Sequence, residues 1–150
     1  GQEAPGVLTM AEALRVEVVS PERVLYSGDA TMVITRTLEG GEVAFQSGHQ
    51  AFLGALIENH TRVFQTDGTI QDIAVHRGFV EVHGNPTIVS ILSDTAELAA
   101  DIDVDRAKEA LERHQLILKQ ENDEDVLSAA ISGKARAQAR LAAANVSFTS

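Results

Sequence analysis

The clearest structural signal in this 150-residue chain is the stretch Arg62-Val63-Phe64-Gln65-Thr66-Asp67-Gly68-Thr69-Ile70-Gln71. Runs with β-branched and aromatic residues flank Asp67-Gly68, a dipeptide that readily adopts the positive backbone angles of a two-residue hairpin turn. Strands joined by such a turn are antiparallel neighbours. The stretch therefore predicts a β-hairpin and indicates that the chain around it is also antiparallel β structure.

The same kind of pattern continues on both sides of this hairpin. Upstream, apolar and polar residues alternate over residues 14–18, and residues 30–38 form a β-branched run. Downstream, the turn His83-Gly84-Asn85-Pro86 separates two further runs with strand character. Many short strands with frequent turns are typical of a sandwich or a barrel. We therefore predict an antiparallel β-sandwich or barrel over residues 14–100.

Residues 101–150 change to a helical pattern. Asp103 can cap a first helix, and Glu121-Asn122-Asp123 is a polar break before a second helix that is rich in alanine, with Gly133 as a weak point inside it. The short break predicts an antiparallel helical hairpin. Small alanine faces bury little apolar area at about 25 cal/mol per Å². We therefore expect the hairpin to be weakly held and able to detach and extend.

The distribution of charge limits the class of protein. Residues 1–100 carry 13 acidic residues and 5 arginines without a lysine, and after Asp125 the only charged side chains are Lys134, Arg136 and Arg140. An acidic body argues against nucleic-acid binding, which needs a basic surface. The sequence has no cysteine and no apolar run of the ~20 residues that a membrane-spanning helix needs, so we expect no direct membrane insertion.

Four segments carry a more specific signal. They are Val16 to Gly28, Gly48-His49 followed by Leu53-Gly54-Ala55-Leu56, Ala74-Val75-His76-Arg77-Gly78-Phe79-Val80-Glu81-Val82, and Ile102-Asp103-Val104-Asp105-Arg106-Ala107. In this order and spacing, with a β domain followed by a helical hairpin, they resemble the epsilon subunits of bacterial F-type ATP synthases. The resemblance runs from Leu14 to Leu141. Residues 1–9 match nothing in it, and we interpret residues 1–13 as an unstructured leader or tag remnant.

The resemblance implies a function for the whole chain. It implies a non-catalytic rotor subunit of the central stalk, which couples proton flow to ATP synthesis and inhibits ATP hydrolysis through its helical hairpin. The implied partners are the gamma subunit and the ring of c subunits for the β domain, and the alpha and beta subunits for an extended hairpin. The implied location is the cytoplasmic face of the bacterial inner or plasma membrane, as a peripheral protein that requires no cofactor.

Charged residues on the predicted hairpin form the candidate site. Asp103, Arg106 and Arg113 share one face of the first helix, and Arg136 and Arg140 are four residues apart on the second. Folding of the hairpin would gather these guanidinium groups, and their forked donors suit phosphate oxygens. The resemblance adds a regulatory ATP that is bound without hydrolysis, and it implies the binding residues Glu97, Asp103, Arg106, Arg113, Arg136 and Arg140. The alternative is that these are solvated helix charges and that Asp103 is only a cap.

Little in the sequence supports catalysis or a metal site. It has neither a Gly-x-Ser-x-Gly elbow nor a phosphate-binding glycine loop with lysine, and no pair of its five histidines has metal-ligand spacing beside a carboxylate. We therefore expect no catalytic residue and no metal ligand. Two other interpretations remain: a free-standing sensor that binds a nucleotide or anion without a partner, and a small enzyme that uses carboxylates such as Glu81 and Glu97.

Overall fold

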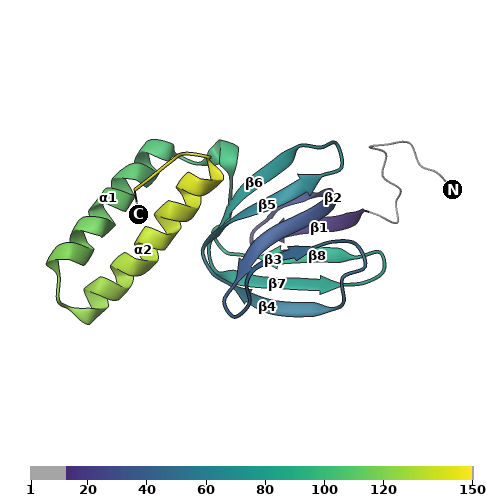
Figure 1. Ribbon diagram of the computed structural model, residues 1–150, viewed down its shortest axis with the longest axis horizontal. Helices are drawn as coiled ribbons and strands as arrows, with labels where there is room; N and C mark the ends of the chain where they lie inside the picture. Colours follow the sequence, from purple (N-terminus) through teal and green to yellow (C-terminus); the bar gives the residue numbers. More distant parts are fainter. Residues whose placement is uncertain (1–12, 150) are drawn as a thin grey trace.

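The computed structural model describes residues 13–149, in which nine strands are followed by a short 3-10 helix and two α-helices (Figure 1). The strands are β1 (Leu14–Val19), β2 (Val24–Thr37), β3 (Gly41–Phe45), β4 (Phe52–Leu56), β5 (Asn59–Gln65), β6 (Ile70–Val75), β7 (Gly78–His83), β8 (Ile88–Leu92) and β9 (Glu97–Leu98). The helices are η1 (Ala99–Asp101), α1 (Val104–Gln120) and α2 (Glu124–Ala143). The leader predicted over residues 1–13 lies, except for its last residue, outside the described residues.

The strands form one sheet that folds over into two layers (Figure 1). Hydrogen-bonded neighbours follow the order β1-β8-β7-β4-β2-β5-β6-β9, while β3 pairs with β2 and β1 also pairs with β2. The 14-residue β2 pairs with β1 through residues 24–30 and with β3 and β5 through residues 30–37. Because the first part of β2 pairs with β1 and its later part pairs with β3 and β5, this strand joins the two layers. The predicted β-sandwich followed by a helical hairpin is confirmed.

One strand pairing differs from the antiparallel arrangement that the sequence predicted. Strands β1 and β8 run parallel, with Val16 opposite Val89 and Val18 opposite Ile91. Alternation along each strand indicates which side chains are buried, and it does so correctly for both strands. It contains no information on which distant strand lies alongside or in which direction that strand runs.

The core lies between the two layers and is built from alternate strand positions. Leu14, Val16 and Val18 of β1 are buried while their neighbours are more exposed, as the alternation predicts. Most of the side chains that they meet are β-branched, which suits a pleated, close-packed interior. The remaining buried members of this core are Ala30, Val33, Phe45, Leu56, Val63, Ile73, Val75, Val80, Val82, Val89 and Ile91.

Helices α1 and α2 form the predicted antiparallel hairpin, and each begins at an aspartate cap. The Asp103 carboxylate accepts the backbone N–H of Arg106 at 3.1 Å, and Asp123 accepts those of Asp125 and Val126 at 2.9 and 3.1 Å. Both helices therefore start where the sequence indicated. The buried contact between them is made by Ala107, Leu111, Ala137 and Leu141.

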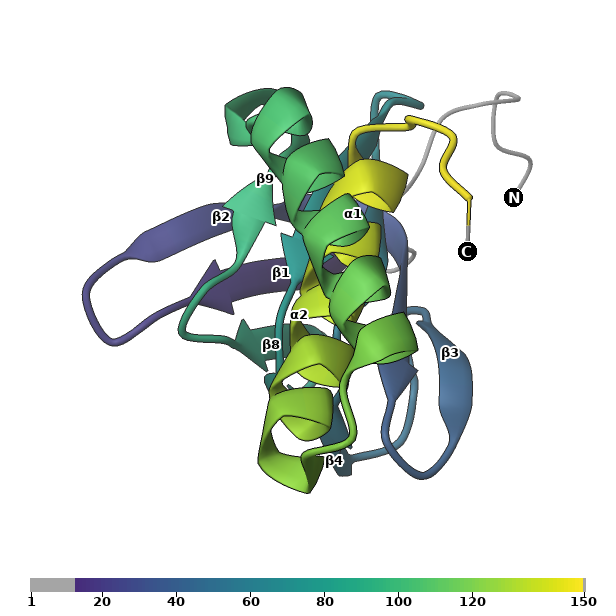
Figure 2. The ribbon, with the colours of Figure 1, turned by 90° about the vertical axis from the view of Figure 1, so that its left-hand side faces the viewer.

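Helix α2 rests on strands β5 and β6, so the hairpin covers one end of the β domain (Figures 1 and 2). Ala74 of β6, Ile102 and Ala143 form the apolar contact between the two parts. Two of these three side chains are methyl groups, so the area buried across the contact is small. Within residues 13–149, no helix is both long and apolar enough to cross a membrane.

Gly78 is predicted to be essential for the pairing of β7 with β8. A Cβ at this position would lie 1.9 Å from the Leu92 carbonyl oxygen, so Gly78→Ala should force the two backbones apart. We expect it to lower the free energy of unfolding by about 3 kcal/mol or more. Gly68→Ala is the control: Gly68 has a φ of 89°, but a Cβ there meets no atom within 4 Å, so the loss should be about 1 kcal/mol. Urea unfolding of the full chain measures both, and equal losses contradict the clash.

Candidate functional site

A pocket of about 610 Å³ lies between the helical hairpin and the edge of the β domain at β9 and η1. Figure 2 views the molecule from this side, with α1 and α2 in front of the strands. Every residue of the site predicted from the sequence lines this pocket, so the fold brings all of them together. The complete lining is Glu97, Asp101, Asp103, Arg106, Ala107, Glu109, Ala110, Arg113, His114, Gly133, Arg136 and Arg140.

Guanidinium groups dominate the chemistry of the pocket. Arg106 and Arg113 come from α1, and Arg136 and Arg140 come from successive turns of α2. Among the described residues, Arg140 alone of these four has a carboxylate within 4.0 Å. Three guanidinium groups without an ion-pair partner around one cavity favour an anion with several oxygens. Asp103 faces the same cavity but already uses one oxygen to cap α1.

Glu97 links the two parts of the molecule. Its Oε1 accepts a hydrogen bond from Nε of Arg140 at 2.5 Å and lies 3.5 Å from Nε2 of His76. The pair bridges β9 and α2, and the two side chains are 32% and 30% exposed. Its contribution therefore lies between the about 1 kcal/mol of an exposed pair and the about 3 kcal/mol of a buried charge-assisted bond.

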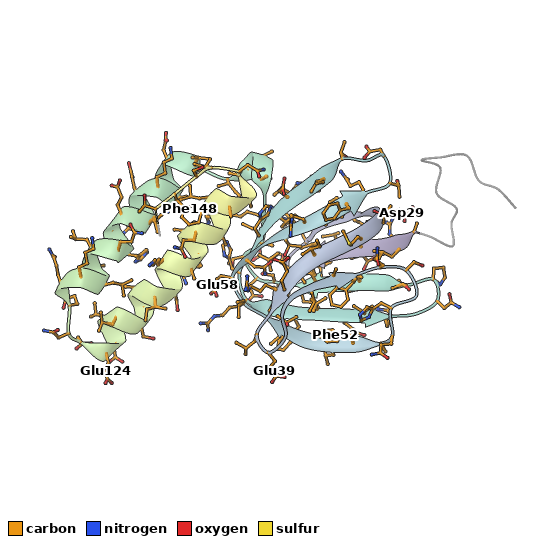
Figure 3. The ribbon with its side chains drawn as sticks, viewed as in Figure 1. Asp29, Glu39, Phe52, Glu58, Glu124 and Phe148 are labelled. Atoms are coloured by element: carbon orange, nitrogen blue, oxygen red, sulfur yellow. The ribbon has the colours of Figure 1, made fainter. Side chains whose placement is uncertain are left out.

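His76 lies behind Glu97 in the interior. It is 3% exposed, and among residues 13–149 neither ring nitrogen has a hydrogen-bond partner, although Nε2 lies 3.5 Å from Oε1 of Glu97. Burial, followed by the charge of Arg140, lowers the pKa of His76 below its ordinary 6.5, while Glu97 and Glu58 oppose that shift. Figure 3 shows Glu58 at the end of the β domain that faces the helices. The sequence marked His76 only as part of a strand segment.

His114 of α1 lies directly against Gly133 of α2, and sequence reasoning missed both as pocket residues. A Cβ on Gly133 would fall 2.3 Å from Nε2 of His114, so a side chain there would displace the ring. Nδ1 of His114 is buried without a partner. Burial, followed by the charges of Arg113 and Arg136, lowers the pKa of His114. The glycine that the sequence presented as a weak point in α2 therefore leaves room for the ring of His114 between the two helices.

The arrangement gives no support to the carboxylate enzyme considered above. Glu81 lies on β7 and Glu97 on β9, and strands β4, β2, β5 and β6 stand between them in the sheet. Among residues 13–149, no group of three or more histidine and carboxylate side chains is placed to hold a metal ion. The pocket between the hairpin and the β domain gathers the charged side chains described above and is therefore the candidate site.

The β domain and the fold as a whole are similar to known ATP synthase proteins. The β-sandwich domain of the ATP synthase delta/epsilon chain matches residues 13–99, which is the β domain described above. The fold also resembles a chain in the cryo-EM structure of the Euglena gracilis mitochondrial ATP synthase, OSCP/F1/c-ring, with a TM-score of 0.78 at 20% identity over 97% of this chain and 89% of that one. A chain of the Tetrahymena thermophila mitochondrial ATP synthase central stalk and c-ring gives a TM-score of 0.60 at 15% identity, over 87% and 96%.

Sequence relatives narrow the class further. An ATP synthase epsilon chain of Brevibacillus brevis is 48% identical over 101 residues, which are 67% of this chain and 74% of the relative. The epsilon chains of Streptomyces avermitilis and Rhodococcus erythropolis are 40% and 45% identical over 104 and 103 residues, covering 69% and 68% of this chain and 82% and 81% of theirs. The chain belongs to the ATP synthase epsilon-chain family.

The lowered pKa of His76 predicts that acid destabilises the fold. A group whose pKa is lower in the folded chain stabilises it fully above the unfolded pKa, and this contribution is lost as the pH falls through 6.5 toward the folded pKa. His76→Gln cannot ionise, so the variant should lose less stability than the wild type between about pH 7.5 and about pH 5. Urea unfolding across this range measures the difference. His83→Gln, at an exposed histidine, should retain the wild-type pH dependence, and the same dependence in His76→Gln would contradict the prediction.

Proposed function

We propose that the chain is a non-catalytic subunit of the rotating central stalk, which couples proton flow to ATP synthesis and restrains ATP hydrolysis. Membership of the epsilon-chain family supports a place in the stalk. The sequence contains neither a nucleophile elbow nor a phosphate-binding glycine loop, which supports a non-catalytic role. The subunit works at the cytoplasmic face of a bacterial membrane as a peripheral protein, through contacts with other subunits.

An apolar strip on the outside of the β domain supports docking on the gamma subunit and the ring of c subunits. Phe79 of β7 and Leu92 of β8 face each other across the strand pair and are 57% and 44% exposed. Leu53 of β4 is opposite Glu81, two residues from Phe79 on the same face, and is 71% exposed. Large apolar side chains grouped on one outer face are typical of protein interfaces.

The pocket is proposed to bind ATP without hydrolysing it. The observation that carries this proposal is the convergence of four arginines on one cavity of about 610 Å³, three of them without an ion-pair partner within residues 13–149. A cavity of this volume accommodates a small-molecule ligand such as a nucleotide. Arg106, Arg113 and Arg136 have free donors for phosphate oxygens, and Asp103 and Glu97 can accept hydrogen bonds from the rest of the ligand.

The hairpin is proposed to switch between the folded form and an extended form that contacts the alpha and beta subunits and inhibits hydrolysis. The folded form is held by small apolar contacts and by the pair of Glu97 and Arg140, so the two forms need differ by only a few kcal/mol. Extension would free Lys134, Arg136 and Arg140 to bind an acidic surface. Because ATP would bind the folded form alone, it would oppose inhibition.

A free-standing nucleotide or anion sensor is the second candidate, because the arginines that gather around the pocket suit a polyanion whether or not the chain belongs to a stalk. Such a sensor would bind ATP alone and would have no partner in the stalk. Co-purification from the native source separates the two functions. A stalk subunit is recovered together with the gamma subunit, whereas a sensor is recovered without it.

Removal of one pocket arginine should weaken ATP binding. Arg113→Ala deletes a charged donor and is expected to cost about 1.5–3 kcal/mol, or roughly a 10- to 150-fold rise in Kd. Arg23→Ala, at an exposed arginine in the turn between β1 and β2, should leave the Kd unchanged. Isothermal titration calorimetry of the full chain measures these values. Absence of binding heat with the wild type at millimolar ATP would overturn the nucleotide site itself.

Two single substitutions should move ATP hydrolysis by the assembled complex in opposite directions. Lys134 does not line the ATP pocket, so Lys134→Ala should weaken only the extended form and raise hydrolysis. Arg113→Ala should weaken ATP binding to the folded form and therefore lower hydrolysis at intermediate ATP concentrations. Lys108→Ala, on the exposed part of α1, is the matched control. Equal rates in all three complexes, across low and high ATP, would place the inhibition elsewhere than in α2.

A further inference from the structure

His114 differs from every other side chain that lines the pocket. It alone among these residues has an ordinary pKa near neutral pH, since the others are arginines, carboxylates, alanines and glycine. The charges of Arg113 on its own helix and of Arg136 on α2 act on its ring, which packs against Gly133. The structure therefore places a group that can change its charge inside a cluster of fixed positive charges.

We propose that His114 couples ligand binding to proton binding: its ring is neutral in the empty pocket and takes up a proton when a polyphosphate occupies the pocket. The inference rests on the nucleotide binding proposed above and adds its regulation by pH. The ligand class that it requires is a polyanion, because only a group with several negative charges reverses the local field at the ring.

In the empty pocket, burial and the neighbouring arginines all disfavour the charged form of the His114 ring. Burial disfavours the imidazolium ion, and Arg113 and Arg136 repel it, so the pKa of His114 lies below 6.5. Glu109 on α1 and the carboxylates at β9 and η1 face the same cavity, and they do not reverse this direction. The charged groups that face the cavity are Asp103, Arg106, Glu109 and Arg113 at α1, Arg136 and Arg140 on α2, and Glu97 and Asp101 on β9 and η1.

A bound polyphosphate changes the sign of the field at the same ring. Burial, and then the charges of Arg113 and Arg136, lower the pKa of His114 in the empty pocket, and the ligand adds several negative charges beside these two cations. An opposite charge within about 4–6 Å moves a pKa by about one to three pH units toward the charged form. The coupling needs no direct hydrogen bond between His114 and the ligand, because the field of the phosphates acts on the ring through space.

Gly133 keeps the ring where this field is strong. Since Gly133 lacks a Cβ, the imidazole sits in the seam between α1 and α2, and its Nδ1 is buried. A ring turned out into solvent would feel screened charges and would titrate near its ordinary pKa. The proposed coupling therefore depends on Gly133 of α2 as well as on His114 of α1.

The direction of the pH effect follows from linkage. The ligand-bound form has the higher pKa, so binding takes up a proton between the free and the bound pKa values, and affinity rises as the pH falls through that interval. One proton limits the change to about tenfold in Kd per pH unit. Above the bound pKa and below the free pKa, the contribution of His114 to the pH dependence vanishes.

The direct test is a titration of the histidine rings by NMR on the full chain, with and without saturating ATP, and with tripolyphosphate as a probe of charge alone. Single His→Gln variants assign the five rings. We expect the pKa of His114 to rise by about one pH unit or more with either ligand. An unchanged His114 pKa in a saturated pocket overturns the coupling. A rise confined to His76, beside Glu97 and Arg140, overturns the assignment to His114.

Calorimetry separates failure of the coupling from failure of the binding site. ATP is titrated into the wild type and into His114→Gln in two buffers of different ionisation enthalpy. The wild type should show a buffer-dependent heat that the variant largely lacks, and any proton exchanged by ATP itself is common to both. Binding with equal proton uptake in the two proteins overturns the role of His114 alone. Absence of binding to the wild type overturns the proposed nucleotide site, and the inference fails with it.

Discussion

The ion pair between Glu97 and Arg140 is the constraint on which the arrangement of the two parts depends. It is the only ion pair among the described residues that joins the β domain to the hairpin, and its Nε–Oε1 distance is 2.5 Å. The apolar contact beside it consists mainly of the methyl groups of Ala74 and Ala143 together with Ile102. A hairpin held in this way can be released by a partner that competes for one guanidinium group. The same guanidinium group lines the pocket, so under the proposed function a ligand in the pocket would also act on the attachment of the hairpin.

Local sequence patterns were sufficient for most of the strands and for both α-helices, but they did not mark β3, β4, β9 or η1. Alternation identified β1, Asp67-Gly68 the turn between β5 and β6, and Asp103 the start of α1. Each of these signals arises within a few residues of the chain. Helical periodicity and the family resemblance pointed to five of the six charged residues of the candidate site, the resemblance alone pointed to Glu97, and the fold brings all six to one pocket.

The features that the sequence did not reveal all depend on contacts between distant segments. The parallel pairing of β1 with β8 cannot be read from the alternation of either strand. His76 is unusual only because Glu97 and α2 close over it, and no local pattern marks a buried histidine. Gly133 was expected to weaken α2, because an interior glycine is less favourable in a helix than alanine. Its benefit, which is room for His114, appears only when α1 lies against α2.

The two histidines give the hairpin a response to pH that depends on whether the pocket is filled. In the empty molecule, burial and arginines lower the pKa of both His76 and His114, so a fall in pH weakens the folded hairpin. Under the proposed coupling, a bound polyphosphate raises the pKa of His114, so the same fall in pH strengthens the filled form. Acid would then widen the free-energy difference between the empty and the filled hairpin. A ligand can shift a two-state equilibrium only by its differential affinity for the two states, and protonation of His114 adds to that difference.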